Sequence, residues 1–323
     1  MAEEGETQVN TRRFQHLTRS VVTGLVALFS TASMLVAQAG PSSITTRNPA
    51  LTYNGPAIWL MEDDDTEIYL FGSIHALPPE TPWRRDELMD VFEEADIVYF
   101  ETSARDSGAN YMDFFQIGLA EPGEGVEDVL SEAQYTLLSN AMRDVGLSIE
   151  SIHGQQPWLA SLTLGFISMD AEGEMAGYGV ENWMERELAS SREVRSLESS
   201  TAVAQAFSDL PMEAQIAMLM DGFENPDPDD MNGFESFQTT IRDWLKGNPD
   251  ALYDDTMEEM RVRQPEAYAV MFTNRNTDWA EQLNALMTEE TGTILVVAGA
   301  GHFTGPESVI LMLEDMGWKP EQF

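Results

Sequence analysis

The sequence predicts an α/β fold, with a central mixed β-sheet flanked by helices and covered by a helical cap. Short apolar segments rich in β-branched residues alternate with segments of helical periodicity, which is the pattern of such folds. Two of these strands, at residues 67–71 and 293–298, are followed by the same Gly-x-x-His phrase. Because α/β folds place their chemistry at strand ends, we expect the two strands to be near neighbours that flank one cleft.

The two Gly-x-x-His phrases contain Gly72 with His75 and Gly299 with His302. A glycine lets the backbone turn tightly and approach an ion or a substrate closely. A single histidine after a strand is expected to be a hydrogen-bonded structural imidazole, and only the repeat of the phrase favours a site. We therefore interpret both histidines as site residues and both glycines as part of the motif.

Four elements are expected in the first third of the chain: strands at 57–61 and 67–71 joined as a hairpin, a helix at 82–95 and a strand at 96–100. The last of these strands ends at Glu101. A glutamate directly after an apolar strand is poorly placed for the core and well placed for a site at the edge of the sheet.

The middle of the chain, about residues 110–192, is predicted to be a helical insertion that forms the cap. The expected helices are 111–119, 126–145, 157–169 and 180–192, followed by a short strand at 193–197 that ends at Glu198. The remaining expected elements are helices at 200–220, 234–246, 251–263 and 265–289, the strand at 293–298 and a helix at 307–316. Residues 221–233 are acidic and broken by proline, and we interpret them as a loop because no register gives the spacing of an EF-hand.

The N-terminus indicates export. Three arginines, Arg12, Arg13 and Arg19, precede a run of apolar and small residues at 21–36, and residues 37–39 supply an A-x-A cleavage site. We therefore predict a signal peptide at 1–39, a linker at 40–56 and a single domain at 57–323 in the periplasm or outside the cell.

Two alternatives for the N-terminus stay open. Thr11 to Phe14 partly resemble a twin-arginine signal, although ordinary secretion fits the following residues better. An uncleaved membrane anchor is the other alternative, but a run of about 16 residues is short against the roughly 20 that a span needs. After cleavage, we expect no contact with the membrane.

Composition excludes several functions. The formal charge of −39 disfavours nucleic acid and anionic lipid as partners, because both are bound by neutralising phosphates with Lys and Arg. Cysteine is absent, so the chain has no disulfide, no thiolate nucleophile and no thiolate ligand for zinc. Any metal must therefore be held by His, Asp or Glu.

Two imidazoles and a carboxylate at strand ends are the minimum set for a divalent metal with open positions, the pattern of a catalytic site. Here these are His75, His302 and Glu101. A serine mechanism with Ser73 as nucleophile and His302 as base is an alternative that lacks a nucleophile elbow. His153 lies in a turn between predicted helices and is interpreted as a structural imidazole.

Five phrases in order resemble the TraB/GumN family, which includes the Tiki proteins: YLFGSIHALP, VYFETS, GVENWMERELASSREVRSLES, FTNRNTDWAEQL and VVAGAGHFTGPESVILMLEDMGW. The resemblance extends from about residue 57 to 320. It implies an erythromycin-esterase-like α/β fold with two Gly-x-x-His motifs. It also implies metal-dependent proteolysis with manganese or cobalt, as described for the Tiki members.

Carried over by position, the resemblance makes His75 and His302 the paired motif histidines and Glu101 the acid at a strand end. Arg275 and Asn276 match an Arg-Asn pair of the family, and Glu198 matches the glutamate of a Leu-Glu-Thr segment. The chain departs from the family in two places, with Glu at position 181 where many relatives have Asp, and Ser at 199 where Thr is usual.

The predicted function is therefore a secreted or periplasmic metal-dependent hydrolase that cleaves a peptide or protein substrate. His75 and His302 would hold the ion, with Glu101 as a third ligand or as the general base. Arg275 would bind a substrate carboxylate or a developing oxyanion, and Glu198 would orient its neighbours. The alternative is a non-catalytic factor in export or polysaccharide assembly that keeps the fold.

Overall fold

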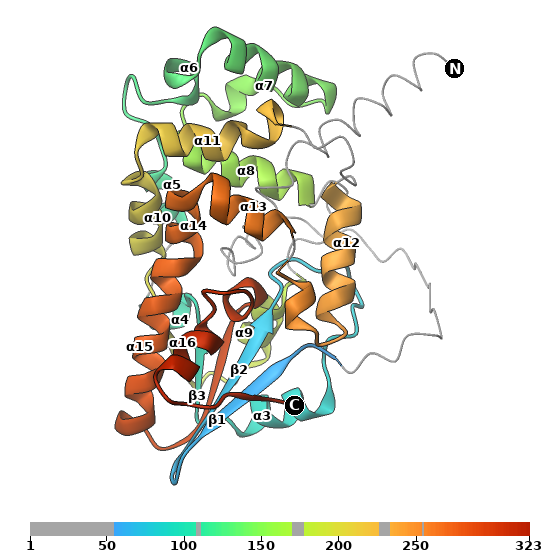
Figure 1. Cartoon of the computed structure of the whole chain (residues 1–323), viewed down its shortest axis with the longest axis vertical. Helices are drawn as coiled ribbons and strands as arrows, with labels where there is room; N and C mark the ends of the chain where they lie inside the picture. The colour runs from blue at the N-terminus through green and yellow to red at the C-terminus, as the bar shows by residue number, and fades with distance from the viewer. Residues whose placement is uncertain (1–54, 108–110, 170–177, 226–232, 254) are drawn as a thin grey trace, which may run out of the picture.

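The computed structural model describes residues 55–107, 111–169, 178–225, 233–253 and 255–323. The predicted signal peptide at 1–39 and the linker up to residue 54 lie outside the described residues. Figure 1 shows a twisted sheet with helices on both faces and a layer of further helices beyond the end of the sheet to which β2 points. The predicted α/β class is confirmed.

The sheet is mixed and has six strands in the order β4-β3-β5-β2-β1-β6. The strands are β1 (Ile58–Glu62), β2 (Thr66–Ser73), β3 (Ile97–Phe100), β4 (Glu193–Ser196), β5 (Gly292–Gly299) and β6 (Glu321–Gln322). The pairs β2–β5, β5–β3 and β3–β4 are parallel, whereas β1 pairs antiparallel with β2 and with β6. The β1–β2 hairpin is as predicted, and β6 is an element that the sequence did not indicate.

The helices of the described residues are α3 (Asp86–Glu94), α4 (Ala104–Ser107), α5 (Tyr111–Ile117), α6 (Val126–Val129), α7 (Glu132–Asp144), α8 (Pro157–Met169), α9 (Val180–Glu187), α10 (Ser200–Ser208), α11 (Met212–Glu224), α12 (Gly233–Trp244), α13 (Asp255–Arg263), α14 (Pro265–Tyr268), α15 (Asn274–Glu289) and α16 (Val309–Asp315). Within that part of the chain, none of these helices is long and apolar enough to cross a bilayer.

Two segments predicted as single helices are each divided. Ser131 begins α7 with a capping box, in which its side chain accepts from the backbone of Gln134, and this separates α7 from α6. Pro211 lies between α10 and α11, where a missing N–H favours a new helix start. The predicted loop at 221–233 is also wrong at its beginning, because α11 continues to Glu224. Residues 226–232 lie outside the described part.

The long helix predicted at 265–289 contains an irregular turn. Between α14 and α15 the chain makes a π-helical segment, Ala269–Thr273. Such a bulge widens the helix by one residue and is often found at functional sites. Here it ends two positions before Arg275, which with Asn276 lies on the buried face of α15.

Apolar side chains on the two faces of the central strands form two separate cores. On one face, Phe71, Leu295 and Val297 pack under α3, α9 and α12. On the other, Ile294 and Val296 pack under α15 and α16. Alternate residues of a strand point to opposite faces, so a strand buried on both faces is apolar throughout, as β5 is.

The layer beyond the sheet is built from helices that precede β4 in the chain and from helices that follow it. In this layer α10 packs on α5, and α11 packs on α8. Two further apolar clusters hold it together, one centred on Trp158 and Phe207 and the other on Leu138 and Leu219. By contrast α9, within the predicted insertion at 110–192, packs against the sheet through Val180 and Met184.

Candidate functional site

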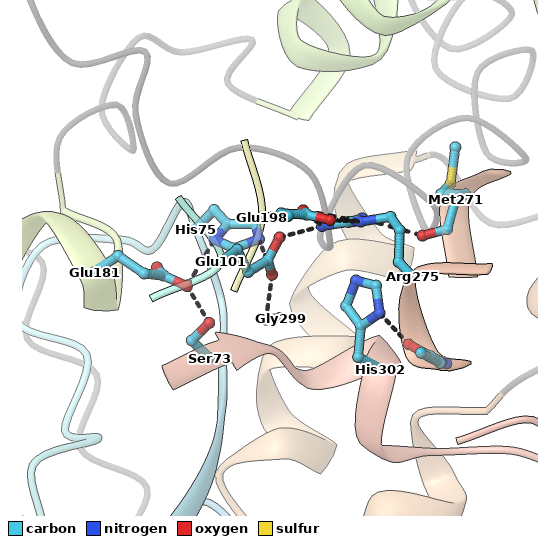
Figure 2. A network of polar contacts seen from close by, with 10 residues as sticks. Ser73, His75, Glu101, Glu181, Glu198, Met271, Arg275, Gly299 and His302 are labelled. Carbon is cyan, nitrogen blue, oxygen red and sulfur yellow. Dashed lines mark hydrogen bonds and ion pairs between the residues drawn. The ribbon is translucent and has the colours of Figure 1, made fainter. Parts of the chain in front are cut away.

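The carboxyl ends of β2, β3 and β5 bring the predicted site residues to one edge of the sheet. Ser73 and Gly299, the last residues of β2 and β5, are register partners. His75 follows two residues after β2, Glu101 follows β3 directly, and His302 lies in the 3-10 turn η4 (Ala300–Phe303) after β5. Their exposed fractions are 5%, 2% and 0%. Figure 2 shows His75 and Glu101 joined in one polar network, with the separate hydrogen bond of His302 drawn beside it.

Gly72 makes the close approach of the two motif loops possible. A Cβ atom at this position would lie 3.1 Å from the Cα and 3.2 Å from the Cβ of Ala300, which is tighter than ordinary van der Waals contact. The carbonyl oxygen of Gly72 accepts a 2.7 Å hydrogen bond from Nε1 of Trp244 on α12. The motif glycine therefore serves packing between β2 and the turn that carries His302.

His75 faces a carboxylate on α9 that the sequence did not identify as a site residue. Its Nδ1 lies 2.8 Å from Oε1 of Glu181, and the hydroxyl of Ser73 donates to the same oxygen. Glu181 is buried, with an exposed fraction of 1%. Burial acts to raise the pKa of Glu181, but the charge that His75 can carry and the hydrogen bonds from His75 and Ser73 outweigh it and lower the pKa.

Gly179 brings α9 against the backbone of His75. The N–H of Val180 donates to the carbonyl oxygen of Ile74 at 3.1 Å. A Cβ on Gly179 would lie 1.9 Å from the carbonyl oxygen of His75, a distance that no side chain can occupy. Only glycine therefore allows the first turn of α9, with Glu181, to reach the first motif.

Glu101 links the two motifs. Its Oε1 accepts a 2.6 Å hydrogen bond from the backbone N–H of Gly299 and lies 3.7 Å from Nε2 of His75. Its Oε2 accepts a 2.6 Å hydrogen bond from Nη2 of Arg275. The carboxylate is therefore held by a backbone donor and a cation while it faces an imidazole.

Arg275 pairs with two glutamates. Nε donates to both carboxylate oxygens of Glu198 at 3.0 Å, Nη2 also donates to Glu198, and Nη1 donates to the carbonyl oxygen of Met271 at 3.0 Å. The guanidinium lies 4.8 Å from the ring centroid of Trp279. All three nitrogens of the guanidinium thus donate to groups of the protein.

Burial and charge act against each other in this cluster. Burial raises the pKa of Glu198, and the charge of Glu101 raises it further, although Arg275 acts to lower it. Burial alone would lower the pKa of Arg275, but the charges of Glu198 and Glu101 raise it instead. The guanidinium therefore stays charged, and one of its partners is a carboxyl group that resists ionisation.

His302 lies between aromatic rings and is bound to an amide. Nδ1 lies 2.5 Å from Oδ1 of Asn276. The imidazole centroid is 4.3 Å from that of Trp279 and 5.3 Å from that of Phe272. Nδ2 of Asn276 donates to the carbonyl oxygen of Glu307 at 2.7 Å. The ring plane and the Nδ1 side of His302 are thus both fixed.

The donor types at this edge suit a divalent cation. Three carboxyl groups, those of Glu101, Glu181 and Glu198, share this edge with one guanidinium group, that of Arg275, so acidic groups are in excess of the permanent cation. In a buried site such an excess is relieved by protons or by a cation. Each motif histidine also has its Nδ1 next to an oxygen, the arrangement that orients histidine ligands of metals.

The ligand set is nevertheless incomplete in its geometry. Among the residues that the structure describes, no three His, Asp or Glu side chains are grouped closely enough to hold a metal ion together. Glu101, the predicted third ligand, has both oxygens engaged by Gly299 and Arg275.

Ser73 and His153, which the sequence analysis considered beside the proposed metal ligands, both contact other side chains of the protein. Ser73, the alternative nucleophile, donates to Glu181. His153 lies in the helical layer, where Nε2 is 2.8 Å from the hydroxyl of Tyr135 and Nδ1 is 3.1 Å from Glu127.

The contribution of Glu181 was missed because an acidic residue in the first turn of a helix is common for electrostatic reasons alone. The glycine two positions earlier was the available signal.

Comparison with known proteins identifies the family to which the domain is similar. The sequence pattern of a family described as TraB/PrgY/gumN matches residues 57–322. A protein of Treponema pallidum (strain Nichols), described as uncharacterized, is 24% identical over an alignment of 265 residues that covers 78% of this chain and 78% of that protein. No solved structure matches the chain.

Proposed function

The chain belongs to the TraB/PrgY/gumN family, and we propose on this premise that it is a metal-dependent hydrolase, a peptidase that works in the periplasm or outside the cell. The observation that supports this most is the pairing of Ser73 with Gly299, which puts the two motif histidines at one edge of the sheet beside buried carboxylates. Parallel strand ends are where α/β enzymes place their sites.

His75 and His302 are the residues that would hold the ion through Nε2, because Nδ1 of each ring faces Glu181 or Asn276. A set of nitrogen and oxygen donors suits manganese or cobalt. Such an ion, when bound, polarises a carbonyl group and lowers the pKa of a coordinated water.

Glu101 has two possible roles, third ligand or general base, and its contacts bear on both. The N–H of Gly299 and the guanidinium of Arg275 hold the two oxygens in fixed positions. A base must be positioned before it can take a proton efficiently, and a ligand must be positioned before it can bind. We favour the base, because Arg275 already neutralises the charge that a ligand would contribute.

Arg275 is proposed as the residue that positions Glu101 and Glu198. Its predicted role, binding a substrate carboxylate or an oxyanion, needs donors that face the substrate. Nε and Nη2 donate to the two glutamates, and Nη1 donates to Met271. Glu198 in turn orients the guanidinium by accepting from Nε and Nη2, in keeping with its proposed indirect role.

A second candidate is a non-catalytic factor in export or polysaccharide assembly. The absence of a three-residue metal group among the described residues favours it, as does the internal pairing of Arg275. In this case, the polar network would stabilise the fold and the edge of the sheet would bind a partner without chemistry.

One experiment separates the two candidates. The purified protein is analysed for bound metal and assayed with a peptide library in the presence of Mn²⁺. The variants are His75→Ala, His302→Ala and Glu101→Gln, with His153→Ala as the control because His153 lies in the helical layer. Cleavage that is lost in the three variants and kept in the control supports the hydrolase. Cleavage that survives all three variants contradicts the site, and neither metal nor cleavage in the wild type supports the second candidate.

A further inference from the structure

The orientation of the Asn276 amide is fixed by a backbone carbonyl. Nδ2 of Asn276 lies 2.7 Å from the carbonyl oxygen of Glu307, and a carbonyl oxygen can only accept a hydrogen bond. The NH2 group must therefore face Glu307. Oδ1 of the same amide is then the atom that faces Nδ1 of His302, at 2.5 Å.

This orientation determines where His302 carries its proton. An amide oxygen accepts but cannot donate, so Nδ1 of His302 must be the donor. In a neutral imidazole only one nitrogen carries a proton, which leaves the lone pair on Nε2. We propose that Asn276 is a positioning residue that fixes the tautomer of His302 with its proton on Nδ1 and its lone pair on Nε2.

The hydrogen-bonded chain from Glu307 through Asn276 to His302 is built from three separate segments. Asn276 lies in the first turn of α15, just after the π-helical segment, and is 2% exposed. Glu307 supplies its carbonyl from the segment before α16, and His302 lies in η4. The rings of Trp279 and Phe272 pack against the imidazole, so it cannot turn away from the amide without losing both contacts.

The tautomer matters for the proposed function, on which this part of the inference rests. A metal ligand or a proton acceptor needs a lone pair on the nitrogen that faces the site. With the proton on Nε2, His302 could donate a hydrogen bond but could not hold an ion there. Asn276 would thus keep the second motif ready for binding without touching the ion or the substrate.

The test is nuclear magnetic resonance of the full chain labelled with ¹⁵N and ¹³C in histidine. At alkaline pH, with chelator present, the ¹⁵N shifts distinguish a protonated nitrogen from one with a lone pair. The chain has only four histidines, and the His302→Gln variant identifies the signals of His302. This readout needs no metal and no substrate.

Three variants make the test specific. Asn276→Leu has nearly the same size but no acceptor, whereas Asn276→Asp keeps an acceptor. Asn284→Leu is the matched control, because Asn284 lies on the same helix and accepts from Nε1 of Trp318 instead of a histidine.

In the wild type, Asn276→Asp and Asn284→Leu, we expect the proton of His302 on Nδ1. In Asn276→Leu we expect this preference to be lost, with the proton on Nε2 or divided between the two nitrogens. A proton on Nε2 in the wild type overturns the inference, and so does an unchanged tautomer in Asn276→Leu. If Asn276→Leu does not fold, the wild-type spectrum and Asn276→Asp decide.

The tautomer and the proposed function can fail separately. A proton on Nδ1 in a protein that binds no metal and cleaves no peptide supports the inference and removes the hydrolase. Cleavage by a protein with the proton of His302 on Nε2 removes the inference and keeps the hydrolase.

Discussion

The backbone N–H of Gly299 donates a 2.6 Å hydrogen bond to Oε1 of Glu101. Gly299 is the first residue of the second Gly-x-x-His motif, and Glu101 directly follows β3, the strand that pairs with β5. A backbone donor cannot rotate away as a side chain can, so this bond ties the position of the acid to the end of β5.

Replacing Arg275 should strongly destabilise the protein. Arg275→Met leaves Glu101 and Glu198 without their shared cation, and breaking a buried ion pair in this way costs about 3–5 kcal/mol. The free energy of unfolding from urea denaturation measures the loss. Arg263→Met is the control, since Arg263 pairs with Asp221 and Glu259 at the surface and should contribute only about 0–1 kcal/mol. Equal losses in the two variants would contradict the buried network.

Gly179→Ala should displace α9 from the first motif. The added Cβ would lie 1.9 Å from the carbonyl oxygen of His75, and relief of such overpacking costs about 1–3 kcal/mol. Gly154→Ala is the control, because a Cβ there has no atom within 4 Å. Urea denaturation should show a loss of stability in Gly179→Ala alone. A Gly179→Ala protein as stable as the control would show that α9 does not press on His75.

A divalent cation should stabilise the native protein. An ion that binds only the folded state at about 100 times its dissociation constant adds about 2.7 kcal/mol to the free energy of unfolding. We expect this gain with Mn²⁺ in the wild type and in His153→Ala, its reversal by chelator, and its loss in His75→Ala and His302→Ala. An equal gain in all four proteins would place the ion elsewhere, for instance on the acidic surface.

The stability contributed by Glu185 should fall as the pH rises. Burial raises the pKa of Glu185 above the ordinary 4.5, although the hydrogen bond from Ser103 acts to lower it. Above pH 4.5 the folded state therefore holds a proton that the unfolded state has released, and stability declines with pH until the folded carboxyl ionises as well.

Glu185→Gln should remove this slope from the pH dependence of unfolding in urea. Glu187→Gln, an exposed position on the same helix, should keep it. A wild-type slope that Glu185→Gln leaves unchanged would assign the pH dependence to other groups.

The mature protein should begin near Gly40. The A-x-A sequence at residues 37–39 carries this expectation. Mass spectrometry of the protein from its native host measures the N-terminus directly. An intact chain that begins at Met1 or Ala2 in the soluble cytoplasm would contradict export, and an intact chain in the membrane fraction would favour the anchor.

Sequence reasoning predicted the sheet well because its signals are local. The β-branched run at β5, the hairpin before His75 and the acid after β3 are each visible within a few residues. The repeated motif predicted that β2 and β5 are near neighbours, since similar strand ends suggest a shared edge, and the structure pairs the two strands in parallel. The mixed sheet of the structure confirms this part.

The contacts that support the candidate site could not be predicted from the sequence. Glu181 reaches His75 only because Gly179 lets α9 approach, and a glycine before a helix does not by itself report which distant segment the helix approaches. The split of the helices at Ser131 and Pro211 was visible as cap and breaker residues, but apolar periodicity on both sides concealed it. The pairing of Arg275 with two acids likewise depends on tertiary placement.

The central position of β5 has a consequence for how the protein is made. This strand lies between β2 and β3 in the sheet, yet it is synthesised long after both. The hydroxyl of Thr66, at the start of β2, donates to the carbonyl oxygen of Glu290, which is 224 positions later in the chain. Until then, the hairpin and β3 present unpaired edges, the kind of surface on which chains associate wrongly. A ribosome that stops before residue 292 therefore releases a product without its middle strand. If the protein is exported as proposed, late closure of the sheet would also keep the chain unfolded until synthesis is nearly complete.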